Sequence, residues 1–235
     1  MDRQGKLGVL GGMGPQATQV FYQFVLDRTD AARDQEHLPA VILSDTGIPD
    51  RTAAILSGDT EGVYLRLLED AKLLEACGCT AIAIPCNTSH YFADALQGEI
   101  GIPVIHMLRE TAAILAAQGK KRPGILATDG TIRTGLYQRE CAAVGLEAAA
   151  PDPDIQELVT SIIYDEIKQG EKGSRDKFAR IDRAVREAGC DCAVLACTEL
   201  SVFSTYHPLP PFYVDAMAVL AERSVERCGY PLRAI

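Results

Sequence analysis

The sequence lacks long apolar runs and long basic runs, and these absences exclude several classes of protein. No apolar run approaches the ~20 residues that a helix needs to cross a bilayer. The first residues lack the long apolar region and cleavage site of a signal peptide, so we expect a cytoplasmic protein. The net charge is −9 and no basic stripe is present, which argues against nucleic acid and anionic membrane surfaces as partners. A small-molecule partner is therefore expected.

Cysteine, in contrast, is plentiful, with eight in 235 residues. An even count can indicate disulfides in a small secreted protein, but this chain is longer and shows no export signal, so free thiols are expected. The pairs Cys77/Cys79 and Cys190/Cys192 suggest a zinc site as one alternative. Structural zinc ligands are usually separated by about two to four residues rather than one, so these cysteines are expected to pack in the core. No metal is predicted.

Short apolar strands alternate with amphipathic helices along the whole chain, which is typical of parallel sheets flanked by helices. The hydrophobic fraction of 47% is sufficient for a packed core. The predicted strands are residues 6–10, 40–44, 80–84, 103–106, 123–127 and 192–195. The predicted helices are residues 18–30, 61–76, 111–118, 134–144, 155–168 and 175–188.

The pattern starts again near the middle of the chain, and the two halves match around two cysteines. Residues 78–86 (GCTAIAIPC) align without gaps with residues 189–197 (GCDCAVLAC), at an offset of 111. Gly8 and Thr18 likewise align with Gly124 and Thr134, at an offset of 116. Chance similarity of short apolar strands is the alternative. Two α/β halves of one ancestral unit explain the matches more simply.

The repeat predicts an α/β fold of two pseudo-symmetric domains, with mainly parallel sheets flanked by helices and the active site in the cleft between the domains. The second half of the repeat begins at about residue 117. Ligands of parallel α/β sheets bind outside the carboxyl ends of the strands. The residues that follow the strands are therefore the candidates for function.

Cys86 and Cys197 each lie just past the end of a predicted strand. If the two halves face each other, one thiolate can remove a proton from a carbon while the other thiol delivers a proton to the opposite face. A cysteine pKa of about 8.5 suits both roles, and a helix after each cysteine is expected to lower it further. A single free cysteine is more often a small buried apolar residue. The matched positions favour catalysis.

A glycine-rich turn follows the first strand, and residues 12–17 (GMGPQA) match the dinucleotide pattern G-x-G-x-x-A. The acidic residue expected about 20 positions further on is not cleanly placed, since Asp45 lies 28 residues past Ala17. The nucleotide interpretation also leaves the cysteine pair unexplained. We favour a carboxylate cradle made by backbone N–H groups at the start of the following helix.

Five motifs, in order along essentially the whole chain, resemble the aspartate/glutamate racemase family. They are residues 11–18 (GGMGPQAT), 48–52 (IPDRT), 86–90 (CNTSH), 163–168 (IYDEIK) and 197–200 (CTEL). The resemblance implies a cofactor-independent, two-cysteine amino-acid racemase that needs neither pyridoxal phosphate nor metal. It also implies a homodimer and a C-terminal helix that returns to the first domain. The predicted first domain therefore comprises residues 1–116 plus 212–235, and the second comprises residues 117–211. Ala196 and Ser89 stand where the family more often has glycine and alanine.

The family pattern implies that Cys86 and Cys197 are the catalytic pair and that Arg51 and Lys168 hold the two carboxylates of the substrate. From position alone, each cation would be interpreted as a solvated surface residue. The other pocket residues implied by the resemblance are Met13, Asn87, Thr88, Thr128, Thr131, Thr198 and Glu199. His90, one helical turn after Cys86, either tunes the thiolate or is hydrogen-bonded in place.

The predicted function is cofactor-independent racemisation of aspartate, glutamate or both. The alternatives are a sister enzyme of the same superfamily, such as a hydantoin racemase or another cysteine-dependent isomerase, a nucleotide-dependent oxidoreductase, and a non-catalytic two-lobed binding protein. The presence of both cysteines together with Arg51 and Lys168 favours reversible racemisation of an acidic amino acid.

Overall fold

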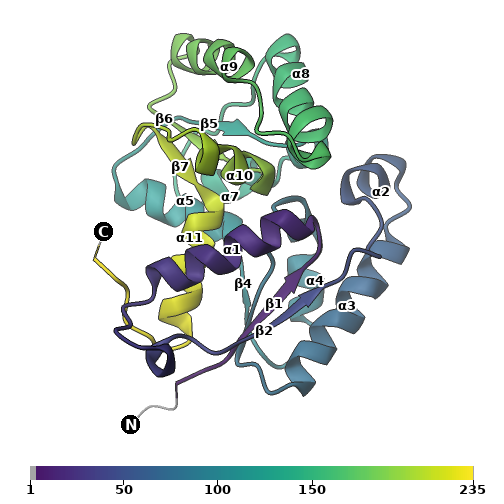
Figure 1. Cartoon of the computed structure of the whole chain (residues 1–235). Coiled ribbons are helices and arrows are strands. Elements are labelled where there is room, and N and C mark those ends of the chain that lie inside the picture. The colour runs from purple at the N-terminus through teal and green to yellow at the C-terminus, as the bar shows by residue number, and fades with distance from the viewer. Residues whose placement is uncertain (1–3, 235) are drawn as a thin grey trace. The chain divides into compact units, whose positions relative to one another are not determined.

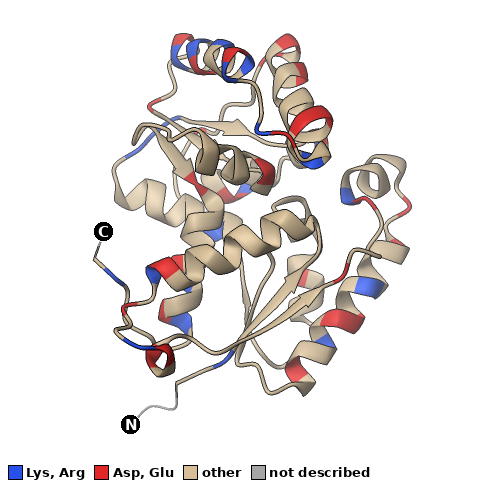
Figure 2. Ribbon diagram, viewed as in Figure 1, with Lys and Arg blue, Asp and Glu red and all other residues tan. Residues whose placement is uncertain are grey.

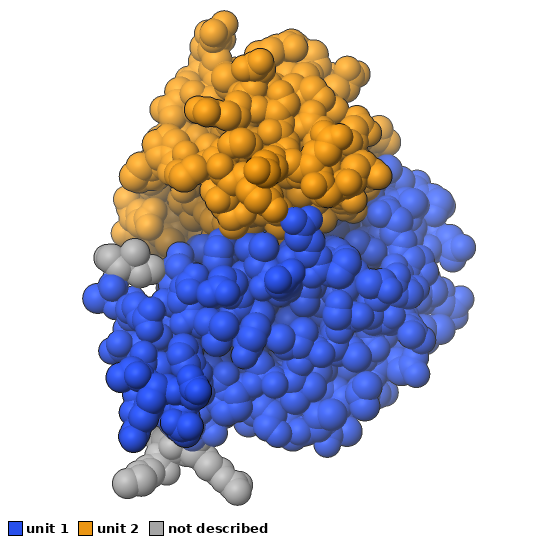
Figure 3. Space-filling model, in the orientation of Figure 1, with its two compact units in different colours: residues 1–107, 217–235 blue, residues 108–216 orange. Residues whose placement is uncertain are grey.

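A computed structural model describes residues 4–234, and the chain divides into two compact units (Figure 3). Unit 1 comprises Met1–Met107 and Met217–Ile235, and unit 2 comprises Leu108–Ala216. Each unit contains a parallel sheet with helices beside it (Figure 1), which confirms the predicted α/β class. Within the described residues, no helix is both long enough and apolar enough to span a bilayer.

Unit 1 is built on four parallel strands in the order β2-β1-β3-β4. The strands are β1 (Leu7–Gly11), β2 (Ala40–Ser44), β3 (Ala81–Ala83) and β4 (Val104–Ile105). The other elements are α1 (Pro15–Arg28), η1 (Asp34–Glu36), α2 (Arg51–Ser57), α3 (Glu61–Ala76), η2 (Thr88–Phe92) and α4 (Ala93–Gln97), with α11 (Ala216–Arg227) from the end of the chain. Every residue of β1 is buried, as expected for a central parallel strand covered on both faces.

Unit 2 is built on three parallel strands in the order β5-β6-β7. They are β5 (Pro123–Leu126), β6 (Cys192–Leu195) and β7 (Tyr213–Asp215). The helical elements are α5 (Met107–Ala117), α6 (Asp129–Arg133), α7 (Leu136–Ala143), α8 (Pro153–Ser161), η3 (Ile162–Glu166), η4 (Ile167–Gln169), α9 (Arg175–Glu187) and α10 (Thr198–Tyr206). Charged residues concentrate on helices such as α3 in unit 1 and α9 in unit 2 (Figure 2), whereas β5 and β6 are wholly buried.

The internal repeat is present in the strand register of the two units. Gly8 of β1 pairs with Ile82 of β3, and Gly124 of β5 pairs with Ala193 of β6, which are the positions that the two sequence offsets equate. A parallel bridge joins Gly124 of β5 to Ala149. Ala149 thus lies beside β5 as β2 lies beside β1. Both units therefore have the same strand order.

Equivalent threonines in the two units, Thr18 in the first turn of α1 and Thr134 at the end of α6, make the same side-chain hydrogen bond. The Thr18 hydroxyl donates to the Gly14 carbonyl (2.9 Å), and the Thr134 hydroxyl donates to the Gly130 carbonyl (2.7 Å). These pairs are equivalent under the offset of 116. A Thr hydroxyl commonly bonds the carbonyl four residues before it in a helix, so the matched contacts agree with the repeat but do not by themselves establish it.

The boundaries of the units differ from the predicted domains at two places. Helix α5 belongs to unit 2 from Leu108 onward, where Arg109 Nε bonds Glu140 Oε2 (3.0 Å), although residues 108–116 had been assigned to the first domain. Strand β7 also belongs to unit 2, because it extends the sheet beside β6. An apolar periodicity predicts a helix or strand but does not show which sheet it joins. The predicted first domain also included residues 1–3 and 235, which lie outside the described residues.

The C-terminal helix belongs to unit 1, as the resemblance implied. From Met217 onward the chain is part of that unit. The Gly5 N–H donates to the Cys228 carbonyl (2.8 Å), and Arg28 Nε bonds Glu222 Oε1 (2.9 Å). The end of the chain therefore supports both the start of β1 and helix α1.

The predicted helix over residues 155–168 is not a continuous α-helix. Helix α8 ends at Ser161, a π-helix covers Ile162–Glu166, and a 3-10 helix covers Ile167–Gln169. The apolar spacing of this segment is compatible with helical turns of more than one width, so it does not reveal the change. The segment carries Lys168, and its geometry therefore determines where that cation points.

Candidate active site

Cys86 lies in a turn that follows β3 in unit 1. Its backbone N–H donates to the Ile84 carbonyl (2.7 Å), which bends the chain immediately after the strand. The residue is only 6% exposed and belongs to the same core cluster as Met13. Asn87 and Thr88 are also buried, so the predicted polar residues of this turn are shielded from bulk solvent.

His90 holds this turn in place. Its Nε2 accepts the backbone N–H of Met107 (3.0 Å), so Nδ1 carries the proton and donates to the Cys86 carbonyl (2.9 Å). Burial, and then the neighbouring His106, lower the pKa of His90 to about 3. His90 is therefore neutral at physiological pH, and of the two roles considered for it the structure supports the positioning role.

Arg51 begins α2 and is buried, contrary to what its position in the sequence alone would suggest. The Asp50 side chain caps the helix by accepting the Ala53 N–H (2.7 Å). The guanidinium then turns back and donates to the carbonyls of Pro49 (3.0 Å) and Met13 (3.4 Å). Arg51 thus joins the start of α2 to the turn after β1, which brings together two of the predicted site residues.

The turn after β1 does not offer the Gly12 amide to an anion. The Gly12 N–H donates to the Thr18 hydroxyl (2.9 Å), so this amide is already occupied, and a carboxylate cradle made by the amides at the start of α1 stays a prediction. Gly12 has φ +92°, and a Cβ there would lie 2.3 Å from the Asp45 carbonyl oxygen. The Asp45 carboxylate bonds Arg66 Nε (2.5 Å) and accepts the Gly47 N–H, so it is not presented to a ribose as a dinucleotide site would require.

In unit 2, Cys197 stands at the N-cap position of α10, directly after β6. Its thiol donates to Glu199 Oε2 at 2.9 Å, and the Thr198 hydroxyl donates to the same oxygen at 3.3 Å. Burial and then Glu199 raise the pKa of Cys197 well above its usual value. The prediction that the helix dipole lowers the pKa of Cys197 is therefore wrong. Burial and the neighbouring carboxylate destabilise the thiolate by more than the dipole stabilises it.

Lys168 is exposed and lies over the ring of Tyr164, with Nζ 4.2 Å from the ring centroid. Its charge acts on Cys197 in the opposite sense to Glu199, favouring the thiolate. Sequence reasoning had no role for Tyr164, although its spacing of four residues from Lys168 on a predicted helix was the available signal. The aromatic face gives the ammonium group a defined resting position.

Thr128 and Thr131 form the start of α6 after β5. The Thr128 hydroxyl caps the helix, and the two hydroxyl oxygens lie 3.3 Å apart. Gln156 Nε2 supports this turn by donating to the Ala127 carbonyl (2.9 Å) and to Asp129 Oδ1 (2.9 Å). Because β5 and β6 are parallel neighbours, the threonines and Cys197 follow the same edge of the unit 2 sheet.

Of the remaining paired cysteines, Cys79, Cys190 and Cys192 are buried packing residues, whereas Cys77 is exposed, so the expectation that it packs in the core is wrong. A Cβ added to Gly8 would lie 3.3 Å from Cys79 Sγ, and one added to Gly124 would lie 3.3 Å from Cys190 Sγ. Burial raises the pKa of Cys192 to about 12. Among the residues that the structure describes, no group of three or more His, Cys, Asp and Glu is placed to hold a metal ion.

Comparison with known proteins identifies the family. The family model described as Asp/Glu/Hydantoin racemase matches residues 10–223. The chain is 27% identical over 225 residues to the broad specificity amino-acid racemase RacX of Bacillus subtilis, covering 93% of this chain and 96% of RacX. It is 31% identical over 146 residues to a glutamate racemase of Cupriavidus pinatubonensis, covering 60% of this chain and 52% of that protein.

Solved structures agree. The Picrophilus torridus aspartate racemase superimposes with a TM-score of 0.81 at 29% identity, over 97% of this chain and 96% of that one. A putative Asp/Glu racemase from Yersinia pestis gives a TM-score of 0.80 at 25% identity, over 95% and 99% of the two chains. The chain belongs to the Asp/Glu/hydantoin racemase family and is an enzyme of the amino-acid racemase class.

Proposed function

We propose that the chain racemises an acidic amino acid, and that Cys86 and Cys197 are the two groups that exchange protons with the α-carbon. The observation that carries the proposal is the equivalence of the two cysteines. Each follows the strand that pairs with the first strand of its unit, in the same register, and each is 6% exposed. A two-base inversion needs two such groups of similar chemistry.

The surroundings of Cys197 favour its thiol form at rest. The contact with Glu199 and the raised pKa keep the proton on sulfur, so Cys197 is suited to protonate the intermediate. In that direction the thiolate of Cys86 removes the α-proton, and Cys197 donates its own proton to the opposite face. The reaction therefore ends with Cys86 as the thiol and Cys197 as the thiolate. The reverse direction needs the opposite protonation of the pair: Cys197 must first lose its proton, for which the adjacent Glu199 carboxylate is the acceptor at hand, and Cys86 must carry the proton that it delivers to the other face of the α-carbon.

Two cations are proposed to bind the two carboxylates of the substrate. Arg51 is buried and held by backbone carbonyls, and arginine can bind one carboxylate through two parallel hydrogen bonds. Lys168 is exposed and supplies a compact point charge rather than a planar fork. Asn87, Thr88, Thr128, Thr131 and Thr198 are the proposed donors to the enolate-like carboxylate that forms when the α-proton leaves.

The test is α-proton exchange in heavy water, followed by NMR, with both enantiomers of aspartate and of glutamate. Wild-type protein is expected to incorporate deuterium with inversion, and both Cys86→Ala and Cys197→Ala are expected to lose inversion. Cys192→Ala is the matched control, since it removes a buried thiol from the strand that precedes Cys197.

Inversion retained in either site variant would overturn the two-cysteine mechanism. Inversion of alanine or lysine without exchange of aspartate or glutamate would overturn the acidic substrate while leaving the amino-acid racemase class intact. Inversion of a 5-substituted hydantoin alone would instead favour the sister enzyme. The homodimer and the cytoplasmic location expected from the sequence stay predictions.

A further inference from the structure

The segment that carries Lys168 changes its helical geometry twice within eight residues. The π-helix at Ile162–Glu166 has a wider turn than an α-helix, and the 3-10 helix at Ile167–Gln169 has a narrower one. The change falls at Glu166, whose backbone has φ −118° and ψ −74°. One extra residue in a turn rotates everything after it by about 100°, so this junction sets the direction of Lys168.

Apolar contacts alone do not fix that junction. Ile162, Ile163 and Ile167 are buried and determine which face of the segment packs into unit 2. Hydrophobic burial is not directional, however, and the same face can be buried with the turn wider or narrower. A directional contact is needed to select one geometry.

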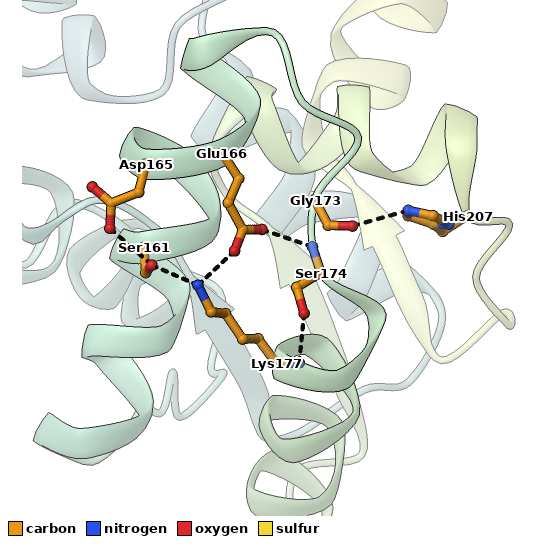
Figure 4. Close-up of polar contacts among 7 residues, drawn as sticks. All are labelled: Ser161, Asp165, Glu166, Gly173, Ser174, Lys177 and His207. Carbon is orange, nitrogen blue, oxygen red and sulfur yellow. Dashed lines mark hydrogen bonds and ion pairs between the residues drawn. The ribbon is translucent and has the colours of Figure 1, made fainter.

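Glu166 makes such contacts with the start of α9 (Figure 4). Its Oε2 accepts the backbone N–H of Ser174 (2.7 Å), and its Oε1 is paired with Lys177 Nζ (2.5 Å). Lys177 Nζ also donates to the hydroxyl of Ser161 (2.9 Å), the last residue of α8. The carboxylate is 11% exposed, so the pair is shielded from water on the Glu166 side. Both ends of the π-helix are thereby fastened to α9.

We propose that Glu166, paired with Lys177, is a positioning residue that sets the direction of Lys168 and thereby the affinity for the substrate carboxylate. The inference rests on the proposed role of Lys168 as a carboxylate anchor. Glu166 itself does not touch substrate. It selects the π-to-3-10 junction, and Tyr164 then supports the ammonium group that the junction places over its ring.

The experiment compares Glu166→Gln with Asp165→Asn in the intact protein. Asp165 is the matched control, because it is the adjacent carboxylate on the same π-helix but is exposed and accepts only from Ser161 (2.8 Å). Because Lys168 would bind ground state and transition state alike, Glu166→Gln is expected to raise KM for the acidic substrate about tenfold with kcat little changed. Asp165→Asn is expected to leave both constants close to wild type.

Two further variants and a second readout separate positioning from general stability. Lys177→Arg keeps the ion pair and is expected to hold KM near wild type, whereas Lys177→Met is expected to raise it as Glu166→Gln does. Limited trypsin digestion, with fragments ending at Lys168 quantified by mass spectrometry, reports order in the segment without any substrate. Faster cleavage there is expected for Glu166→Gln and Lys177→Met only.

The outcomes are distinct. A lowered melting temperature with unchanged KM and unchanged cleavage at Lys168 would overturn the inference and leave Glu166 a stabilising residue. Wild-type protein that fails to turn over any acidic amino acid would refute the proposed function. In that case the cleavage pattern alone would still decide whether Glu166 orders the Lys168 segment.

Discussion

Replacing Asp70 by asparagine should make the protein more stable at neutral pH, although it removes a charge from the folded chain. Asp70 lies on α3 and is 6% exposed, and its Oδ2 is buried without a hydrogen-bond partner. Burial, and then the nearby Asp45 carboxylate, raise the pKa of Asp70 to about 6. An amide can donate to Asp45 as the protonated acid does, and it carries no charge to bury.

The sign and size of the stability change follow from the difference between the pKa of Asp70 in the folded chain and in the unfolded chain. Between the ordinary pKa of 3.8 and the folded pKa of about 6, the folded chain holds more protons than the unfolded chain. Stability from this group is therefore present at low pH and is lost as pH rises through about 4 to 6. Two pKa units correspond to at most about 3 kcal/mol. We expect Asp70→Asn to recover about 1–2 kcal/mol above pH 7, because the charged side chain can partly relax toward water.

The assay is thermal unfolding of wild type, Asp70→Asn and Glu69→Gln at pH 4.5 and pH 7.5. Glu69 is the matched control, since it precedes Asp70 on α3 and its side chain is 72% exposed. The expected gain for Asp70→Asn is about 3–6 °C at pH 7.5 and little at pH 4.5, with no change for Glu69→Gln. A loss of stability at pH 7.5, or an equal gain at both pH values, would refute the reasoning.

Two further predictions concern the site itself. Glu199→Gln removes the negative charge beside Cys197, so the pKa of this thiol is expected to fall. Its alkylation by iodoacetamide at pH 8, followed by mass spectrometry, should then become at least several-fold faster. An unchanged rate would refute the assigned contact. Gly12→Ala is expected to destabilise the protein by more than about 2 kcal/mol in urea unfolding, because the new Cβ meets the Asp45 backbone. Gly58→Ala is the control, because Gly58 also has a positive φ (+81°) but nothing lies within 4 Å of the new Cβ, and it is expected to destabilise the protein by about 1 kcal/mol. Equal costs for the two glycine variants would contradict the close approach at Gly12.

The sequence was informative where the apolar pattern has only one interpretation. Strands 40–44 and 192–195 and helix 61–76 match β2, β6 and α3 residue for residue, because each carries a run or period of apolar residues with one interpretation. The helix predicted for residues 134–144 instead begins at Leu136, since Gly135 adopts a left-handed conformation (φ +63°) that ends the preceding short helix α6. In the sequence, a glycine inside a helical pattern only weakens the prediction of a helix and does not reveal that its φ is positive.

The sequence predicted where the two candidate cysteines lie in the fold, but not how their surroundings change the pKa of Cys197. The repeat placed Cys86 and Cys197 after equivalent strands, and the structure bears out that placement in each unit. The direction of the pKa shift of Cys197 was predicted wrongly. The helix dipole can be inferred from the order of elements, whereas the contact between the thiol and the carboxylate two residues away depends on side-chain conformation, which the sequence does not show. The same limit applies to Asp45, whose ion pair with Arg66 depends on packing between β2 and α3.

The two cysteines are equivalent in the backbone but not in their surroundings, and this asymmetry has a consequence for the proposed reaction. Cys86 is held through its carbonyl by His90, which is neutral, whereas Cys197 bonds the Glu199 carboxylate through its thiol. A symmetric pair would start each direction of racemisation equally well. Here one direction begins with Cys197 already protonated, and the other requires its proton to reach Glu199 first. The pH dependence of kcat should therefore differ between the L- and D-enantiomers, with the enantiomer deprotonated by Cys197 requiring the higher pH.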